Sequence, residues 1–283
     1  MFHEGELAVQ DRAGVRLEAA RLSGMLAPGG LSRGAAGWLA ERTLAVVTGR
    51  DAAGRLWASA LTGAPGFLAG LGRTLRVGAT LPAGDPLHDL PAGQRVGLIA
   101  IDFATRRRMR VNGTLTRVDE LTIDVAEAFG NCPQYIHPRR LEAAPAAPAT
   151  FTAPGKLSPA DVAAVRGADT FFLGTAHPVR GADASHRGGP PGFLRSDGDG
   201  GELWWPDYPG NNMFNSLGNL AADPAAALLV PDFTTGRTLH LSGTATVEWT
   251  EAGTGAPDEV TGRRVRFHPT AVVAGVHPAL TAR

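Results

Sequence analysis

The chain contains almost no cysteine and almost no lysine. Cys132 is the single cysteine in 283 residues, which excludes an internal disulfide and a thiolate-rich metal site. Lys156 is the single lysine. An anion held by a cationic side chain must therefore be held by arginine, assisted by backbone N–H groups and small polar side chains.

An excess of one charge sign and long apolar runs are also missing. Lys+Arg and Asp+Glu number 27 each, so we expect no nucleic-acid partner and no electrostatic membrane contact. No apolar run has the length of a membrane span, and residues 1–14 hold no apolar signal core. Apolar residues make up 43%, enough for the core of one large or two ordinary domains. These features predict a soluble, cytoplasmic protein.

Two pairs of segments repeat in order along the chain. WASALTGAPGF, which ends at Phe67, matches DASHRGGPPGF, which ends at Phe193, and IDFATRRRMRVNGTLT (101–116) matches PDFTTGRTLHLSGTAT (231–246). We therefore predict an internal duplication, with a first, degenerate unit over 1–145 and a second unit over 146–283. The Ala/Pro-rich stretch 141–159 is typical of a semi-rigid linker between them.

Strand patterns dominate both units. Apolar and polar residues alternate over 108–115 and 238–247, a period of two that is typical of half-buried antiparallel strands. RTLAVVTG, RVGLIAIDF, DTFFLGTA and AALLVPDF are short apolar runs of strand length. Many short strands with few helices predict a mainly β fold built from small barrels. The expected helices are 33–42, 158–166 and 212–223.

The second unit carries polar groups that the first unit lacks. Ser185, His186 and Arg187 precede a glycine-rich bend, after which we expect a strand to begin at Phe193, whereas the first copy keeps only the serine. Segment 202–224 adds polar and aromatic side chains around the start of a predicted helix, where backbone N–H groups favour anions. The cofactor-binding candidates in this segment are Trp205, Asp207, Tyr208, Asn211, Asn212, Asn215, Ser216 and Asn219. Turn and cap chemistry is the alternative reading of the asparagines.

Three segments of the second unit resemble the pyridoxamine 5′-phosphate oxidase-like, FMN-binding split barrels. ADTFFLGTAHP resembles the opening strand, NMFNSLGNLAADPAAALLVPDF the phosphate-binding loop, helix and next strand, and GRTLHLSGTATV the strand that follows. The FHEGE start and the GNCPQYI segment are similar to a two-barrel bacterial subfamily of unassigned function. The resemblance implies two tandem split β-barrels packed as a pseudo-dimer. The cations usual in that loop are absent, since Asn215 and Ser216 stand near their positions, which leaves Arg187 as the cationic phosphate partner.

The resemblance also implies a cofactor and an activity. FMN is the implied cofactor, with deazaflavin F420 or FAD as alternatives, and the implied activity is an FMN-dependent oxidoreductase acting on an unidentified small molecule. Electrons would come from a separate flavin reductase or from NAD(P)H. The alternatives are a flavin or deazaflavin carrier or sensor without turnover, and a barrel that has lost its cofactor and serves in assembly. Further association into a homodimer is left open.

Segment 129–140 has no counterpart in the second unit and could reach across to the flavin. Asn131 and Gln134 are then expected at its pyrimidine edge and Cys132 near its reactive ring, as the candidate catalytic residue. A small buried hydrophobe is the alternative reading of Cys132. The arginine run 106–110 is interpreted as a solvated strand edge. No spacing among the histidines indicates a metal site.

Overall fold

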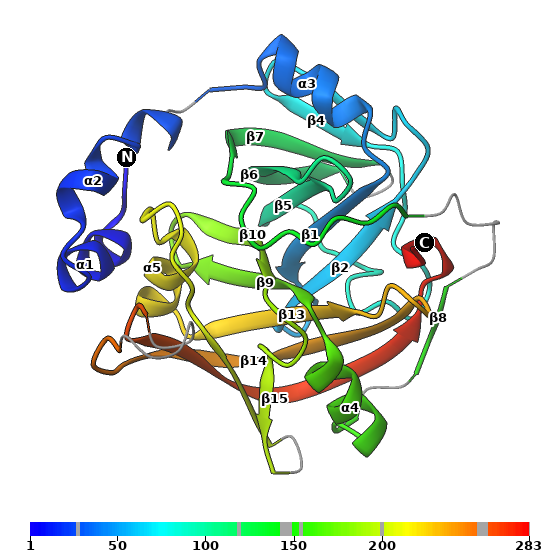
Figure 1. The fold of residues 1–283 in the computed structure, drawn as a ribbon. Coiled ribbons are helices and arrows are strands. Elements are labelled where there is room, and N and C mark those ends of the chain that lie inside the picture. The colour runs from blue at the N-terminus through cyan, green and yellow to red at the C-terminus, as the bar shows by residue number, and fades with distance from the viewer. Residues whose placement is uncertain are drawn as a thin grey trace.

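The computed structural model describes residues 1–26, 29–117, 120–141, 149–152, 155–198, 201–253 and 260–282. Two antiparallel sheets account for most of the regular secondary structure in this part of the chain, with a few helices outside them (Figure 1). The prediction of a mainly β protein is confirmed. None of the described helices is long and apolar enough to cross a membrane.

The two sheets have the same strand order. The first runs β2-β1-β5-β6-β7-β4-β3 and the second β10-β9-β13-β14-β15-β12-β11, so each strand of one has a counterpart in the other. The first sheet comprises β1 (Leu44–Arg50), β2 (Leu56–Thr62), β3 (Leu68–Leu71), β4 (Thr74–Val77), β5 (Arg95–Asp102), β6 (Arg107–Arg117) and β7 (Leu121–Gly130). The second comprises β9 (Thr170–His177), β10 (Gly181–Gly188), β11 (Arg195–Asp197), β12 (Glu202–Pro206), β13 (Ala225–Pro231), β14 (Arg237–Trp249) and β15 (Arg263–Val276), with β8 (Thr150–Phe151) paired to β15. Two tandem barrels, as predicted, follow from this correspondence.

Matched bulges sit at the glycines shared by the repeats. The register of β6 shifts between Asn112 and Gly113, and that of β14 between Ser242 and Gly243. A Cβ on Gly113 would lie 2.2 Å from a carbonyl oxygen of β7, and one on Gly243 2.0 Å from a carbonyl oxygen of β15. Only glycine fits at this close approach, which bends both long strands around their barrels.

The repeated PGF motif is a turn that connects the two edge strands of each sheet. Gly66 and Gly192 have φ of 99° and 87°, a conformation that glycine adopts without strain. The phenylalanine of each motif folds back onto an earlier glycine, Phe67 onto Gly63 and Phe193 onto Gly189. A Cβ on either glycine would lie 2.6 Å from the phenylalanine side chain, so only glycine fits there. The expected strand start at Phe193 is wrong, because this backbone is still in the turn and β11 begins at Arg195.

Three helices lie close to their predicted ranges. They are α3 (Arg33–Ala40), α4 (Pro159–Gly167) and α5 (Asn215–Ala222). Ser158 caps α4 in a capping box with Asp161, as its sequence indicates. The helix α5 begins at Asn215 rather than at 212, because Asn212 and Phe214 both have φ of 59°.

The helices near the N-terminus were not predicted. These are α1 (Glu4–Arg12), α2 (Arg16–Ala20) and the short 3₁₀ helix Ser23–Leu26; a second 3₁₀ helix, Pro278–Leu280, lies near the C-terminus. Figure 1 shows α1 beside α5, where Gly5 and Gly218 let the two backbones approach closely. Because α1 buries Glu6 and Gln10 together with Val9, its sequence lacks the apolar stripe by which a helix is usually recognised.

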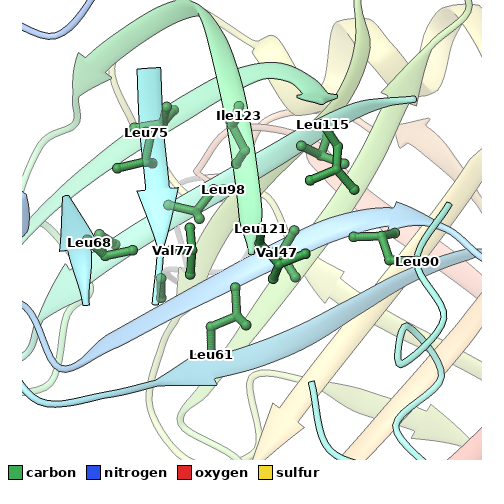
Figure 2. Close-up of a cluster of buried hydrophobic side chains, with 14 of the residues drawn as sticks. Val47, Leu61, Leu68, Leu75, Val77, Leu90, Leu98, Leu115, Leu121 and Ile123 are labelled. Atoms are coloured by element: carbon green, nitrogen blue, oxygen red, sulfur yellow. The ribbon is translucent and has the colours of Figure 1, made fainter. Parts of the chain in front are cut away.

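Each barrel has its own apolar core, and a third cluster joins the barrels. Figure 2 shows the first core, to which Val47 and Leu98 contribute. Along β1, Ala45 and Val47 face this core, while Leu44 and Val46 face the cluster between the barrels. Strands buried on both faces explain the unbroken apolar runs of the sequence. The predicted division between 145 and 146 lies outside the described residues.

Candidate functional site

A partly open cavity of about 110 Å³ lies between the two barrels. It is formed by β6 and the segment after β7 of the first barrel, and by β10, β12 and the loop before α5 of the second. Its lining residues are 108, 110, 131, 132, 134 and 135 on one side, and 186–188, 193, 205–212 and 214–217 on the other. The two halves of the chain thus meet at the segments that the sequence singled out.

Three guanidinium groups converge on this cavity. Arg108 and Arg110 lie two residues apart on β6 and both line the cavity, and Arg187 lines it from β10. Arg110 Nη1 donates to Asp183 at 2.8 Å, and Arg187 Nη1 lies 3.4 Å from Asp207 Oδ1. Arg108 instead donates to His186 Nδ1 at 2.8 Å, and no carboxylate partner of Arg108 occurs among the described residues.

The arginines carry more positive charge than their carboxylate partners compensate. Asp207 is shared, because its Oδ2 also accepts from Arg263 Nε at 2.9 Å. Four guanidinium groups thus face two carboxylates, which leaves two excess positive charges. Burial, with the charges of Arg110 and Arg187, lowers the pKa of Arg108 to about 9, and burial also lowers that of Arg187. Burial thus makes the charged form of both arginines costly, and an anion in the cavity would offset part of that cost.

His186 is held as a neutral hydrogen-bond donor. Its Nδ1 accepts from Arg108, so the ring proton must sit on Nε2. Burial, followed by the charge of Arg108, lowers the pKa of His186 well below its usual value. The ring stands edge-on to Phe103 and Phe172, with centroids 6.0 and 5.8 Å away, and this apolar setting keeps the imidazole uncharged.

Several buried polar atoms around the cavity have no partner. Among the described residues, eleven buried side-chain N or O atoms lack a hydrogen bond, and five of these belong to residues that line the cavity. The five atoms are Arg110 Nε, Asn131 Oδ1, His186 Nε2, Arg187 Nε and Trp205 Nε1. Because buried polar groups are normally satisfied, this concentration indicates a site built to bind a polar molecule.

The two tyrosines of the chain stack on each other at the cavity wall. Tyr135, from the first barrel, lies over Tyr208, from the second, with ring centroids 5.1 Å apart and an interplanar angle of 22°. Tyr208 in turn stacks on Phe193 at 6.4 Å. Tyr135 has φ of 62° and is 38% exposed. These flat surfaces suit an aromatic ring, as the sequence predicted for Tyr208.

The structure separates the polar candidates near α5 into two groups. Asn211, Asn212, Asn215 and Ser216 line the cavity. Asn219 does not, because it bonds His3 and Thr175 under α1. Ser185 is fully buried behind the cavity, where its hydroxyl donates to the Leu173 carbonyl and accepts from Ser216 at 3.1 Å. We therefore assign Asn219 and Ser185 to the support of the site.

The remaining candidates also lie at the cavity, in differing roles. Asn131, Cys132 and Gln134 line it from the first barrel, and Trp205 from the second. Trp204, the neighbour of Trp205, faces away and bonds Asp197. Asp207 lines the cavity as the ion-pair partner of Arg187 and Arg263, so its carboxylate orients arginines and is unsuited to touch a phosphate. Contact of any of these residues with a ligand stays a prediction.

Arg108 and Arg110 were missed at the sequence level. The run 106–110 resembled a solvated strand edge, whereas Arg108 and Arg110 face the second barrel and Arg110 is 11% exposed at its side chain. The available signal was positional, because Arg110 occupies the strand position of His240 in the repeat. His240 is buried at the corresponding contact and bonds the Ala58 carbonyl at 3.0 Å.

The corresponding place on the other side of the pseudo-dimer is filled. Ser59, the counterpart of Ser185, donates a hydrogen bond to the buried Asp85 at 2.6 Å. Ser185 instead accepts a hydrogen bond from Ser216. Phe151, from β8, packs on His240 with centroids 5.6 Å apart and also contacts Gly84. Leucine side chains from 81–90 join the first barrel core there. That the first unit is a degenerate copy stays a prediction, which the filling of this place supports.

Three side chains that could hold a metal lie together where the N-terminal segment packs on the second barrel. They are His3, Glu4 and His177, and their potential metal-ligand atoms lie within 4.8 Å of one another. Backbone N–H groups donate to Nδ1 of both rings, so both protons must sit on Nε2, the atoms that face Asn219 and Glu4. A metal would need these nitrogens deprotonated. The cluster is therefore explained by hydrogen bonding.

Comparison with known proteins finds one family model that matches part of the chain, within the second barrel. Residues 157–256 match the family model described as pyridoxamine 5′-phosphate oxidase, as the resemblance in the sequence indicated. No curated protein sequence matches the chain.

Three similar solved structures each cover less than half of the chain. A protein of Clostridium acetobutylicum related to general stress protein 26, of the pyridoxine-phosphate oxidase family, is 14% identical over 43% of this chain and 87% of its own, with a TM-score of 0.30. An FAD-binding protein of Mesorhizobium loti is 10% identical over 46% of this chain and 99% of its own, with a TM-score of 0.31. An F420 reductase is 16% identical over 39% of this chain and 93% of its own, with a TM-score of 0.29.

Proposed function

From the match of residues 157–256 to the pyridoxamine 5′-phosphate oxidase family, we propose that this two-barrel protein binds FMN between its barrels and acts as an oxidoreductase on a small molecule. The cofactor class follows from that family. The cavity supports the choice of a phosphorylated flavin, because it combines an anion site with aromatic surfaces.

The observation that carries the proposal is the uncompensated positive charge in the cavity. Arg108, Arg110 and Arg187 converge there with two more positive than negative charges among them and their partners. A phosphate monoester near neutral pH carries about two negative charges, which matches this excess. Arginine also binds phosphate in a bidentate manner, with stronger hydrogen bonds than neutral donors form.

The other residues would bind and orient the rest of the ligand. The backbone N–H groups at the start of α5 lie at the cavity and can donate to phosphate oxygens, while the Ser216 hydroxyl donates to Ser185 behind them. Asn131 and Gln134 offer amide groups suited to the polar edge of a flavin, and Tyr208 offers a ring face. When bound, FMN would supply the electron transfer between a reductant and the substrate or dioxygen. Cys132 lines the same cavity and remains the candidate catalytic residue.

The size of the cavity constrains how a flavin can enter. Its 110 Å³ are less than the roughly 300–1,000 Å³ of typical small-molecule sites. A ligand with three fused rings therefore requires a side chain to move. Tyr135 is the exposed member of the aromatic stack, and we expect it to leave Tyr208 when the ligand binds.

Replacing Tyr135 by alanine should therefore strengthen FMN binding. The tyrosine stack is worth about 0.5–1.5 kcal/mol, and its prior removal should raise the affinity by roughly twofold to tenfold. Tyr208→Ala removes the ring face itself and should weaken binding. Quenching of flavin fluorescence measures both affinities. Equal weakening by the two substitutions would show instead that Tyr135 stacks on the bound ring.

Two measurements test the proposed function and separate it from its alternatives. Mass spectrometry of the small molecule released from the purified protein should detect FMN, while FAD or deazaflavin F420 would revise the cofactor. A colourless protein that takes up no added flavin would contradict every cofactor proposal and favour the assembly module. Steady-state consumption of NADH, NADPH or oxygen by the loaded protein, alone or with a separate flavin reductase, distinguishes an oxidoreductase from a carrier or sensor.

A further inference from the structure

A second hollow adjoins the cavity on the side of the first barrel. It is a groove of about 420 Å³ between α3, the β5–β6 turn and the end of β7, lined by Trp38, residues 105–109, Gly130, Asn131 and Pro133. Arg108 and Asn131 line both hollows, so the groove begins where the cavity ends.

The groove is basic and lacks compensating charge. Arg106, Arg107 and Arg108 line it in sequence, and none of its lining residues is acidic. Within the part of the chain that the structure describes, no carboxylate forms an ion pair with any of these three arginines. By contrast, Arg55, Arg73 and Arg76, which are exposed elsewhere on this barrel, each pair with a carboxylate.

Arg107 is held in place before any ligand arrives. Its guanidinium lies over the ring of Trp38 at 5.6 Å, and that of Arg42 lies over the same ring at 4.5 Å. Arg42 is fixed by Asp102 at 2.6 Å, so the indole ring has a fixed neighbour. A cation stacked on an aromatic ring keeps its N–H groups free for an anion. Arg106 is placed by the turn, where its φ is 53°.

We propose that this groove, which we call the Arg106–Arg107 groove, binds a second anionic group next to the flavin phosphate site. The group is a phosphate or a carboxylate. It belongs either to the distal part of a cofactor longer than FMN or to a separate anionic substrate that meets the flavin. This inference rests on the proposed function for the position of the first ligand, while the charge and shape of the groove stand independently of it.

Paired titrations of FMN and FAD test the first source. In Arg106→Gln/Arg107→Gln, the affinity for FAD should fall about tenfold while that for FMN stays within twofold. The matched control is Arg21→Gln/Arg33→Gln, which makes the same charge change at exposed residues outside the groove. The control should leave both affinities unchanged at physiological ionic strength.

Inorganic pyrophosphate tests the second source. Calorimetric titration of the FMN-loaded protein should show pyrophosphate binding that weakens about tenfold in Arg106→Gln/Arg107→Gln and not in the control pair. A loss for FAD assigns the groove to the cofactor, and a loss for pyrophosphate alone assigns it to a separate substrate. Equal affinities of wild type and groove variant for both probes would overturn the proposal, as would equal losses in the control pair.

The experiment can show that the groove binds an anion even if the protein binds no flavin. If the protein binds no flavin, pyrophosphate can be titrated into Arg187→Ala, in which the cavity site is weakened and the groove is intact. Binding that disappears on adding the groove substitutions would then support the groove alone. Binding that persists unchanged would contradict it.

Discussion

Arg187→Ala should weaken FMN binding by about tenfold to a hundredfold, because a charge-assisted hydrogen bond contributes roughly 1.5–3 kcal/mol. Arg187 sits on β10 at the cavity, and its Nε has no partner. Its ion pair with Asp207 is long, at 3.4 Å, so the guanidinium is available to a stronger acceptor. Quenching of flavin fluorescence at fixed ionic strength gives the dissociation constant.

Two variants control for the loss of charge and for general damage. Arg187→Lys retains the charge without the bidentate geometry and should show a smaller loss. Arg166→Ala removes an arginine that does not line the cavity and whose side chain bonds Ser196, and it should bind FMN normally. An Arg187→Ala protein that is folded and binds FMN as tightly as wild type would exclude Arg187 from the phosphate site.

Asp207→Ala should reduce the free energy of unfolding by about 3–5 kcal/mol, the usual cost of removing one partner of a buried ion pair. Asp207 is 5% exposed and lies between the guanidinium groups of Arg187 and Arg263. Its removal leaves both charges uncompensated in a region that already has an excess of positive charge. Urea denaturation followed by circular dichroism measures the change.

A surface ion pair provides the comparison for Asp207. Asp197 pairs with Arg266 at 2.9 Å, and its side chain is 52% exposed, so Asp197→Ala should cost about 1 kcal/mol or less. Inorganic phosphate should restore part of the stability of Asp207→Ala, because an anion in the cavity replaces the lost charge. A loss below 1 kcal/mol for Asp207→Ala would show that the arginines are not electrostatically strained.

Repetition along the chain made the architecture predictable. The matched PGF turns and the bulge glycines Gly113 and Gly243 are positions where backbone geometry admits only glycine, so both copies retain them. Unbroken apolar runs predicted the strands correctly because their two faces pack on two different cores. Such constraints are local to each barrel, and a single sequence records them.

Contacts between the barrels could not be predicted in the same way. Arg108 and Arg110 alternate with apolar residues on β6, as solvated side chains do, and only the docking of β10 places them inside. Asn219 belongs to the same helix as Asn215, yet α1 covers it and bonds it to His3. Both cases have the same cause, since the periodicity of a strand or a helix does not predict which of its faces is buried by distant parts of the chain.

The proposed function rests on one asymmetric feature, the cavity between the barrels whose arginines we propose hold a phosphate. Parallel titrations of the purified, flavin-free protein with FMN and with riboflavin, which lacks the phosphate, test this most directly. We predict one FMN per chain, since the corresponding place in the first unit is filled by Phe151 and Asp85. We also predict that riboflavin binds at least about a hundredfold more weakly than FMN. Equal affinities for the two flavins, or two equivalents of FMN per chain, would contradict the account.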